Sequence, residues 1–398
     1  MVIIKKFDKF FENFSDKIEI DIDIKLPSDI IEISNAFINA GKDIYLVGGA
    51  IRDTIKGVKP KDYDLVTNAL PDESKAILRR FNVSDEQGKN FGVLRIFTTD
   101  EPAGYELASY RKDISKGRDT KGDDVKVEIG NHITIEDDCN RRDFTCNALF
   151  YDIKNKKIID IVGGISDIKN NIIRAVGNPL KRFNEDRLRI LRAFRFSARI
   201  GADIDEPTKA AIKLDNRLIN ISKIDDVSQE RIWEEMKKAF SQVKSFKKYL
   251  DTFTEFNMWN EVFPGSNINE EVIECDELSS YMANLFRFED RLNLEKKMVI
   301  DYKIESRIVN KVIFLLDFLK ITIDDVTDLY KKKIRCHITT SEIIDWLDLN
   351  GVTNLISIRF IDYLPTVSSE ELISKGFKGK SLGDEIKRLE IENFKNQL

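Results

Sequence analysis

Histidine and cysteine are scarce in this sequence. Its 398 residues include two histidines, His132 and His337, and four cysteines, none of which forms a CxxC pair. Cysteines this few and scattered are unlike a disulfide framework, so we expect a protein of the reducing cytoplasm. Two histidines cannot build a histidine-rich centre such as that of a zincin, so a catalytic metal would have to be bound by carboxylates.

The sequence also lacks a long apolar segment and a strong excess of either charge. No run of eighteen apolar residues occurs, and the N-terminal residues mix lysine with aspartate and glutamate, so we expect neither a membrane span nor a targeting signal. A formal net charge of −5 argues mildly against indiscriminate nucleic-acid binding, although 64 basic residues can gather on one face. With 42% hydrophobic residues, the chain can form the cores of several packed modules.

Two kinds of hydrophobic pattern divide the chain. The first 170 residues contain short β-like runs between Gly, Asp and Asn clusters, with one amphipathic helix predicted from Ser28 to Ala40. The predicted strands are Asp43 to Val47, Asp64 to Val66, Gly92 to Phe97, Tyr105 to Ser109, Val125 to Ile129 and Leu149 to Asp152. After Arg174 helical periodicity prevails, as from Glu185 to Ile200 and from Ser228 to Lys248. We therefore predict an α+β first part and a helical remainder.

A glycine turn and a pair of aspartates follow the first predicted strand. The sequence VGGAIRD, residues 47–53, predicts a strand, a turn at Gly48 and Gly49, and the start of a helix, where backbone N–H groups and Arg52 would bind a phosphate. In the triplet DYD, strand alternation would put the carboxylates of Asp62 and Asp64 on one face, where they would bind Mg²⁺. Either motif alone is more often an ordinary turn or a surface loop.

The order of these motifs, GG-x-x-RD and then DxD, resembles the head domain of the DNA polymerase β superfamily, specifically the family of class II tRNA nucleotidyltransferases and bacterial poly(A) polymerases. The resemblance implies a catalytic head with a mixed sheet and helices at residues 1–172, an all-helical, base-recognising neck at 173–240, and a helical, tRNA-binding body and tail at 241–398. It also implies that Gly48, Gly49 and Arg52 bind the nucleotide and that Asp62 and Asp64 are catalytic metal ligands.

Two further segments are similar to motifs of the same family. Residues 141–149, RRDFTCNAL, match a motif whose arginine and aspartate contact the nucleotide, which implies this role for Arg142 and Asp143. Residues 184–196, NEDRLRILRAFRF, match the EDxxR helix, whose aspartate and arginine act as an amino-acid template for the base. The resemblance thus implies the nucleotide-binding residues Asp186, Arg189, Arg192 and Arg195.

Helical spacing supports this second assignment, because residues three apart share a face and would form a stripe from Asp186 to Arg195. On charge spacing alone, a solvated helix with i,i+3 ion pairs is the alternative. For Arg142 and Asp143 the alternative is an internal salt bridge. The glycine-containing segments 160–164 and 174–177 are similar to the hinge of the family, and a structural turn is an equally good interpretation.

The third catalytic carboxylate of the superfamily is assigned by position. Glu106, in the strand Tyr105 to Ser109, is the best candidate, and a solvent-facing strand glutamate is the alternative. Residues 112–124 match the flexible loop of CCA-adding members, but the usual tyrosine and DxxR spacing are missing, and Arg118 is a candidate substitute.

The resemblance implies a template-independent enzyme that adds C, C and A to the 3′ end of tRNA from CTP and ATP. The RNA 3′-hydroxyl would attack the α-phosphate, two Mg²⁺ ions would stabilise the charge, and pyrophosphate would leave. The acceptor arm and 3′ end of tRNA are the expected partners, with no membrane and no DNA. Addition of CC only, of A only or of a poly(A) tail stays open, as does a non-catalytic RNA-binding protein on this fold.

Overall fold

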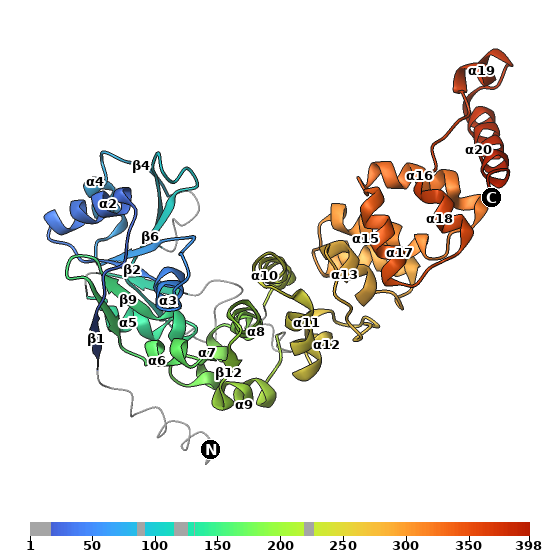
Figure 1. The fold of residues 1–398 in the computed structure, drawn as a ribbon. Coiled ribbons are helices and arrows are strands. Elements are labelled where there is room, and N and C mark those ends of the chain that lie inside the picture. Colours follow the sequence, from blue (N-terminus) through green and yellow to red (C-terminus); the bar gives the residue numbers. More distant parts are fainter. Residues whose placement is uncertain (1–16, 86–91, 115–125, 131, 219–226) are drawn as a thin grey trace. The chain divides into compact units, whose positions relative to one another are not determined.

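The chain folds into two compact units. The computed structural model describes residues 17–85, 92–114, 126–130, 132–218 and 227–398 (Figure 1). The first unit comprises the chain up to residue 228 together with 242–244, and the second comprises 229–241 and 245–398. The first unit therefore contains the predicted head and most of the predicted neck.

A mixed sheet forms the centre of the first unit. Within the described residues it has eight strands in the order β1-β10-β9-β2-β3-β6-β5-β4, and only the β3–β6 pair is parallel. The strands are β1 (Ile18–Asp21), β2 (Ile44–Val47), β3 (Asp64–Thr67), β4 (Asn82–Ser84), β5 (Val93–Phe97), β6 (Tyr105–Ser109), β9 (Leu149–Asp152) and β10 (Lys157–Asp160). A hairpin of β7 (Arg111–Ile114) and β8 (Lys126–Ile129) stands apart from this sheet.

One face of the sheet is apolar and covered by α2 (Ser28–Asn39). Alternate strand residues point to this face, and Leu46, Leu65 and Leu107 are buried on it. Helix α2 contributes a buried stripe, and its Asp29 accepts a hydrogen bond of 3.1 Å from the hydroxyl of Tyr105. This bond fastens the start of α2 to β6.

The opposite face of the sheet is apolar over part of its strands and acidic at one end. Val47, Val66 and Phe150 pack there with Cys139 of α5 (Ile135–Asn140) in one hydrophobic cluster. Two residues before Val66, the same face carries Asp64, whose register neighbour on β6 is Glu106. The carboxylates therefore lie at the edge of a packed core, on the face away from α2.

Helices complete the first unit after the sheet. They are α3 (Gly49–Ile55), α4 (Pro71–Ile77), α6 (Gly164–Lys169), α7 (Pro179–Glu185), α8 (Leu188–Ile200) and α9 (Glu206–Leu214), with the short 3-10 helix η1 (Thr145–Asn147). The neck also contains a two-stranded parallel pair, β11 (Ile172–Ile173) with β12 (Asp203–Ile204). In the described residues of the predicted all-helical neck, the other regular elements are helices.

The second unit is helical throughout its described residues (Figure 1). Its helices are α10 (Gln229–Gln242), α11 (Phe246–Glu255), α12 (Trp259–Val262), α13 (Leu278–Leu285), α14 (Arg291–Lys296), η2 (Lys297–Asp301), α15 (Ser306–Phe318), η3 (Ile323–Asp325), α16 (Val326–Arg335), α17 (Thr340–Leu349), α18 (Leu355–Ile361), α19 (Ser369–Ser374) and α20 (Gly379–Lys395). Phe246 and Tyr249 of α11 pack against each other, and Phe246 also meets Tyr281 of α13 edge to face. No helix among the described residues is long and apolar enough to cross a membrane.

The predicted fold class is confirmed, whereas one predicted long helix is two helices and another, predicted from Glu185 to Ile200, begins only at Leu188. The helix predicted from Ser228 to Lys248 is broken before Phe246, because Ser245 takes an extended conformation and accepts a hydrogen bond from the N–H of Lys248. A serine N-cap starts a new helix in this way. The second break, at Asp186, bears on the site and is described below.

Candidate active site

The glycine turn predicted between a strand and a helix is present and lies beside Asp64. Val47 ends β2 opposite Asp64, and Gly48 has a φ of 73°, which disfavours any side chain there. A Cβ placed on Gly48 would lie 3.5 Å from the Asp64 carboxylate oxygen Oδ2. The turn therefore presents backbone directly beside Asp64, with Gly49 starting α3.

The two aspartates of the DxD motif are held differently. Asp64 is the first residue of β3, whereas Asp62 lies before the strand and is exposed. Strand alternation therefore does not place the Asp62 side chain, and the prediction of two carboxylates on one strand face was wrong for this residue. The strand begins only where antiparallel pairing with β2 begins, at Asp64.

The carboxylates nevertheless act on one another. Burial, followed by the charge of Glu106, raises the pKa of Asp64 to about 6. Asp62 adds to this rise, while the guanidinium of Arg142 opposes it. Burial and the neighbouring carboxylates therefore disfavour the charged form of Asp64, and a bound divalent cation would favour it.

Glu106 is held by a cation of its own. Arg95 stands opposite it on β5, and the Arg95 guanidinium donates a hydrogen bond of 2.6 Å to Glu106 Oε1. Gly104, with a φ of 83°, leaves room for this arginine, because a Cβ there would lie 2.5 Å from Arg95 Cγ. Sequence analysis missed Arg95, since pairing across an antiparallel register is visible only once the register is known.

The chemistry of these side chains supports metal binding, although they do not form a preformed coordination site. Within the described ranges, no three His, Cys, Asp or Glu side chains converge closely enough to hold a metal ion. Asp62 and Asp64 offer the hard oxygen ligands that Mg²⁺ prefers, and their mutual repulsion favours a cation between them. The pair therefore fits a divalent cation, while Glu106 is directed toward Arg95.

The RRDF segment places Arg142 beside the carboxylates. Its guanidinium pairs with Asp138 at 2.9 Å and lies 5.1 Å from the ring centre of Phe150. Arg141 pairs with the same carboxylate at 2.7 Å, and Asp138 is fully buried. Burial alone would raise the pKa of Asp138. The guanidinium groups of Arg142 and Arg141 nevertheless hold this pKa below its ordinary value. Asp138 stands four residues before Arg142, a helical spacing from which sequence analysis could have found it.

Asp143 and Arg192, two predicted nucleotide ligands, are partners of each other. The Arg192 guanidinium lies 2.6 Å from Asp143 Oδ2, while Oδ1 accepts hydrogen bonds from the Phe144 N–H and the Asn147 amide. Burial alone would raise the pKa of Asp143. The charge of Arg192 and these hydrogen bonds nevertheless lower this pKa. The salt bridge that remained as an alternative thus exists, with Arg192 rather than Arg142 as the arginine.

Arg52 is buried and faces the protein interior, with 1% of its surface exposed. It donates to Asp53 at 2.9 and 3.0 Å and to the side-chain oxygen of Asn147 at 2.7 Å. Asn147 in turn donates to Asp143. In this arrangement Arg52 links α3 to the RRDF segment through Asn147, and its guanidinium is buried.

The EDxxR segment is two helices with a break between them. Asp186 follows α7 in an extended conformation, and its carboxylate accepts a hydrogen bond of 3.1 Å from the Leu188 N–H at the start of α8. The prediction that Asp186 and Arg189 share a helix face was therefore wrong, because Asp186 is outside both helices. An aspartate competes with the helical backbone in this manner.

Arg189 connects this break to the RRDF segment. Its guanidinium donates to the carbonyl oxygens of Arg182 and Arg141 at 2.9 and 3.0 Å, and it pairs with Glu185 at 2.9 Å. Arg192 and Arg195 continue at steps of three along α8, as predicted, and Arg195 lies over the ring of Phe196. Arg189 and Arg195 are both buried. The stripe is thus a packed surface rather than a solvated one.

The predicted hinge segment is fastened in place. The Asp160 carboxylate accepts hydrogen bonds from four backbone N–H groups, those of residues 162 to 165. A Cβ on Gly164 would lie 2.2 Å from the carbonyl oxygen of Thr145. Gly164 therefore serves close packing against the 3-10 helix η1. The predicted flexible loop lies largely outside the described residues, and Arg118 lies there too.

Comparison with known proteins gives the site a context. Residues 44–174 match the family model described as "Poly A polymerase head domain". The chain is 29% identical to the CCA-adding enzyme of Ligilactobacillus salivarius (strain UCC118) over 377 residues, 89% of this chain and 88% of that one. It is 32% identical to poly(A) polymerase I of Salmonella typhi over 231 residues, 56% of this chain, and spans about half of that longer relative, 47%.

Solved structures share the fold over nearly the whole chain. The Bacillus stearothermophilus CCA-adding enzyme in complex with CTP matches with a TM-score of 0.71 and 22% identity, over 94% of each chain. The Thermotoga maritima CCA-adding enzyme complexed with tRNA matches with a TM-score of 0.64 and 20% identity, over 95% of each chain.

Proposed function

We propose that this chain, whose residues 44–174 match the family model described as "Poly A polymerase head domain", adds C, C and A to the 3′ end of tRNA from CTP and ATP. The observation that carries this choice is the extent of the similarity. It covers 88% of one CCA-adding enzyme, and two solved CCA-adding enzymes share the fold over 94% and 95% of this chain. Three other CCA-adding enzymes are matched over 46% to 58% of their length, as the poly(A) polymerase is over 47%. The helical second unit thus has a counterpart in CCA-adding enzymes.

Asp62 and Asp64 are the metal ligands in this proposal. When bound, Mg²⁺ would lower the pKa of the RNA 3′-hydroxyl and neutralise charge on the reacting phosphates. Asp64 is positioned by β3 and by the Gly48 turn, so its carboxylate has a fixed place next to the backbone. The 3′-oxygen forms a bond to the α-phosphorus of the nucleotide, the bond to the β-phosphate oxygen breaks, and pyrophosphate leaves.

Glu106 is the third carboxylate in the proposal. Its register beside Asp64 supports the assignment, and its pairing with Arg95 means that it would join the metal ligands by giving up that contact or by using its other oxygen. Arg142, whose charge already reaches Asp64, would contact the nucleotide phosphates.

Base selection is assigned to Asp186 and Arg189, which together offer the acceptor and donors that a base edge requires. Both guanidinium nitrogens of Arg189 that donate in this structure are occupied by Glu185 and by carbonyl oxygens. A base would therefore exchange with Glu185, whose carboxylate is also shared with Arg182. Arg192 and Arg195 would support phosphate binding, and Asp143 orients Arg192.

Incubation of the protein with tRNA that ends at the discriminator base tests this function. CTP and ATP are supplied separately and together, and the products are sequenced. The proposal expects CC with CTP alone and CCA with both nucleotides. Tails of A on unrelated RNA would instead identify a poly(A) polymerase. Products that stop at CC would identify a CC-adding enzyme, and A added only to tRNA that already ends in CC would identify an A-adding enzyme. No extension at all would refute the catalytic assignment.

A further inference from the structure

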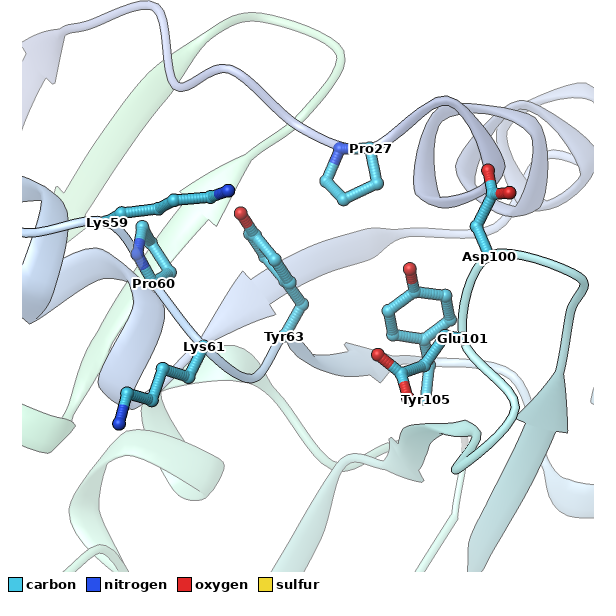
Figure 2. Close-up of a pocket in the computed structure, with 8 residues that line it drawn as sticks. All are labelled: Pro27, Lys59, Pro60, Lys61, Tyr63, Asp100, Glu101 and Tyr105. Atoms are coloured by element: carbon cyan, nitrogen blue, oxygen red, sulfur yellow. The ribbon is translucent and has the colours of Figure 1, made fainter.

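A pocket of about 670 Å³ lies next to the aspartate pair (Figure 2). One wall is the segment that leads into β3, with Lys59 and Tyr63, and the other is the turn between β5 and β6, with Asp100. Pro27 borders the pocket just before α2, and Tyr105 of β6 lies at its base. A volume of this size is typical of small-ligand sites and accommodates one nucleotide. We call it the Tyr63 pocket.

The two tyrosines of the Tyr63 pocket differ in how they are held. The hydroxyl of Tyr105 donates to the buried carboxylate of Asp29, which also accepts from Thr98 at 2.6 Å. Tyr63 is half-buried, and its hydroxyl has no hydrogen-bond partner in the part of the chain that the structure describes. Figure 2 shows the Tyr63 ring standing in the pocket as one of its inner surfaces. A nucleobase can stack on such a ring.

The charges of the Tyr63 pocket are separated between its walls. Lys59 and Lys61 are exposed and form no ion pair with any described residue, and Figure 2 shows the Lys59 amine directed toward the Tyr63 hydroxyl. Asp100, on the other wall, is also exposed and unpaired among the described residues. A ligand with a phosphate at one end and an amino group at the other would satisfy both walls.

We propose that the Tyr63 pocket binds one nucleotide of the RNA strand whose 3′ end lies at Asp62 and Asp64. The base stacks on Tyr63, the phosphate pairs with Lys59, and the exocyclic amine of cytosine or adenine donates to Asp100. The inference rests on the proposed function, because it requires an RNA 3′ end at the aspartates.

Its position favours RNA over the incoming nucleotide as the occupant. Lys61 directly precedes Asp62, so the pocket and the metal ligands share one continuous segment. Tyr105, at the base of the pocket, belongs to the α2 face, whereas Asp64 and Glu106 point to the opposite face. The reacting triphosphate must lie on the carboxylate face, and the α2 side is left for the strand that leads to the 3′ end.

Binding of a fluorescent RNA ending in CC, measured by anisotropy without metal or nucleotide, is the direct test on the full chain. Tyr63→Leu should weaken RNA binding about fivefold or more, because a stacked base is lost. Tyr63→Phe keeps the ring and should bind as the unsubstituted protein does. Lys59→Ala should reduce the slope of log affinity against log salt by about 0.7, the value for one phosphate contact on a single strand.

A matched control and a kinetic arm separate the alternatives. Lys154 is exposed in the turn between β9 and β10, at the other end of the sheet from Asp64, and Lys154→Ala should leave RNA binding unchanged. In extension assays Lys59→Ala should raise the KM for RNA and not the KM for CTP. A rise in the KM for CTP alone would assign the pocket to the free nucleotide and overturn the inference.

The two hypotheses also fail in different ways. If the unsubstituted protein extends tRNA while Tyr63→Leu and Lys59→Ala both bind RNA normally, the pocket assignment is wrong and the proposed function stands. If no extension occurs but Tyr63→Leu weakens RNA binding and Tyr63→Phe does not, RNA binding by the pocket stands and the proposed function is wrong.

Discussion

The two halves of the candidate site differ in how their charge is balanced. On the carboxylate half, burial and then the charges of Glu106 and Asp62 raise the pKa of Asp64 to about 6. On the arginine half, Arg192 pairs with Asp143 and Arg189 with Glu185, so charges of both signs already have partners. In the proposed function the carboxylate half receives a cation, whereas the arginine half would exchange existing contacts to receive a nucleotide.

The largest effect is expected at Asp62 and Asp64, the proposed metal ligands. Asp62→Ala or Asp64→Asn should lower incorporation of both CTP and ATP at least about 10³-fold, because several kcal/mol of charge stabilisation are lost with the metal. Single-turnover rates with tRNA give this measurement. Affinity for tRNA, measured by anisotropy, should change little, and Asp64→Asn should not lower the free energy of unfolding. Retained incorporation would remove these residues from the metal site.

The next prediction concerns the free energy of unfolding and the ion pairs of the arginine half. Asp138→Asn leaves the guanidinium groups of Arg141 and Arg142 without their shared, fully buried carboxylate. Breaking a buried pair of this kind costs about 3 kcal/mol or more. Urea denaturation should show this loss as a lower midpoint with an unchanged slope. An unchanged midpoint would mean that Asp138 does not organise the RRDF segment. Asp152→Asn, in the partly buried end of β9, is a control for removal of an aspartate.

The same residue predicts a pH dependence. The folded-state pKa of Asp138 is lowered, so its contribution is fully present above about pH 4, the ordinary unfolded value, and is lost as pH falls through the lower folded value. The unsubstituted protein should therefore lose stability on acidification below about pH 4. Asp138→Asn should show a shallower loss over that range, and parallel curves for the two proteins would contradict the assignment.

Base selection tests whether the arginine half exchanges its contacts. Asp186→Asn keeps the oxygen that accepts the Leu188 N–H, and so keeps the start of α8, but it replaces one acceptor by a donor. Discrimination of CTP and ATP against UTP should fall about tenfold or more, since one hydrogen bond of the base edge is lost. Ratios of kcat/KM for the three nucleotides give this measurement. Equal loss for all three would indicate a purely structural role.

Much of this site could be predicted from local sequence, and the rest depends on long-range pairing. The VGG turn, the strand at Asp64 and the arginine steps along α8 follow from glycine chemistry and periodicity. The break at Asp186 could not be predicted from periodicity, because a local hydrogen bond from the Leu188 N–H to the Asp186 carboxylate leaves no mark on the apolar pattern around it.

Long-range pairing explains the remaining misses. Arg95 comes to Glu106 only through the register of β5 and β6, and Arg192 comes to Asp143 across 49 residues. Neither pairing leaves a local signal in the sequence. Asp62 was misplaced for a related reason, because the start of β3 is set by its pairing with β2 rather than by the alternation of the DxD triplet itself.

The smallest effect is expected at the Arg95–Glu106 pair. Glu106 belongs to the carboxylate half but already has a cation, and the pair is partly exposed, with 35% and 52% of the side chains accessible. Exposed pairs contribute about 0.2–1 kcal/mol, which corresponds to about 1.4- to 5-fold in an equilibrium constant. Arg95→Gln should therefore strengthen Mn²⁺ binding, followed by electron paramagnetic resonance, by a factor in that range, because Glu106 no longer prefers the guanidinium. Weaker Mn²⁺ binding would instead show that Arg95 positions Glu106 for the metal, and an unchanged affinity would place Glu106 outside the metal site.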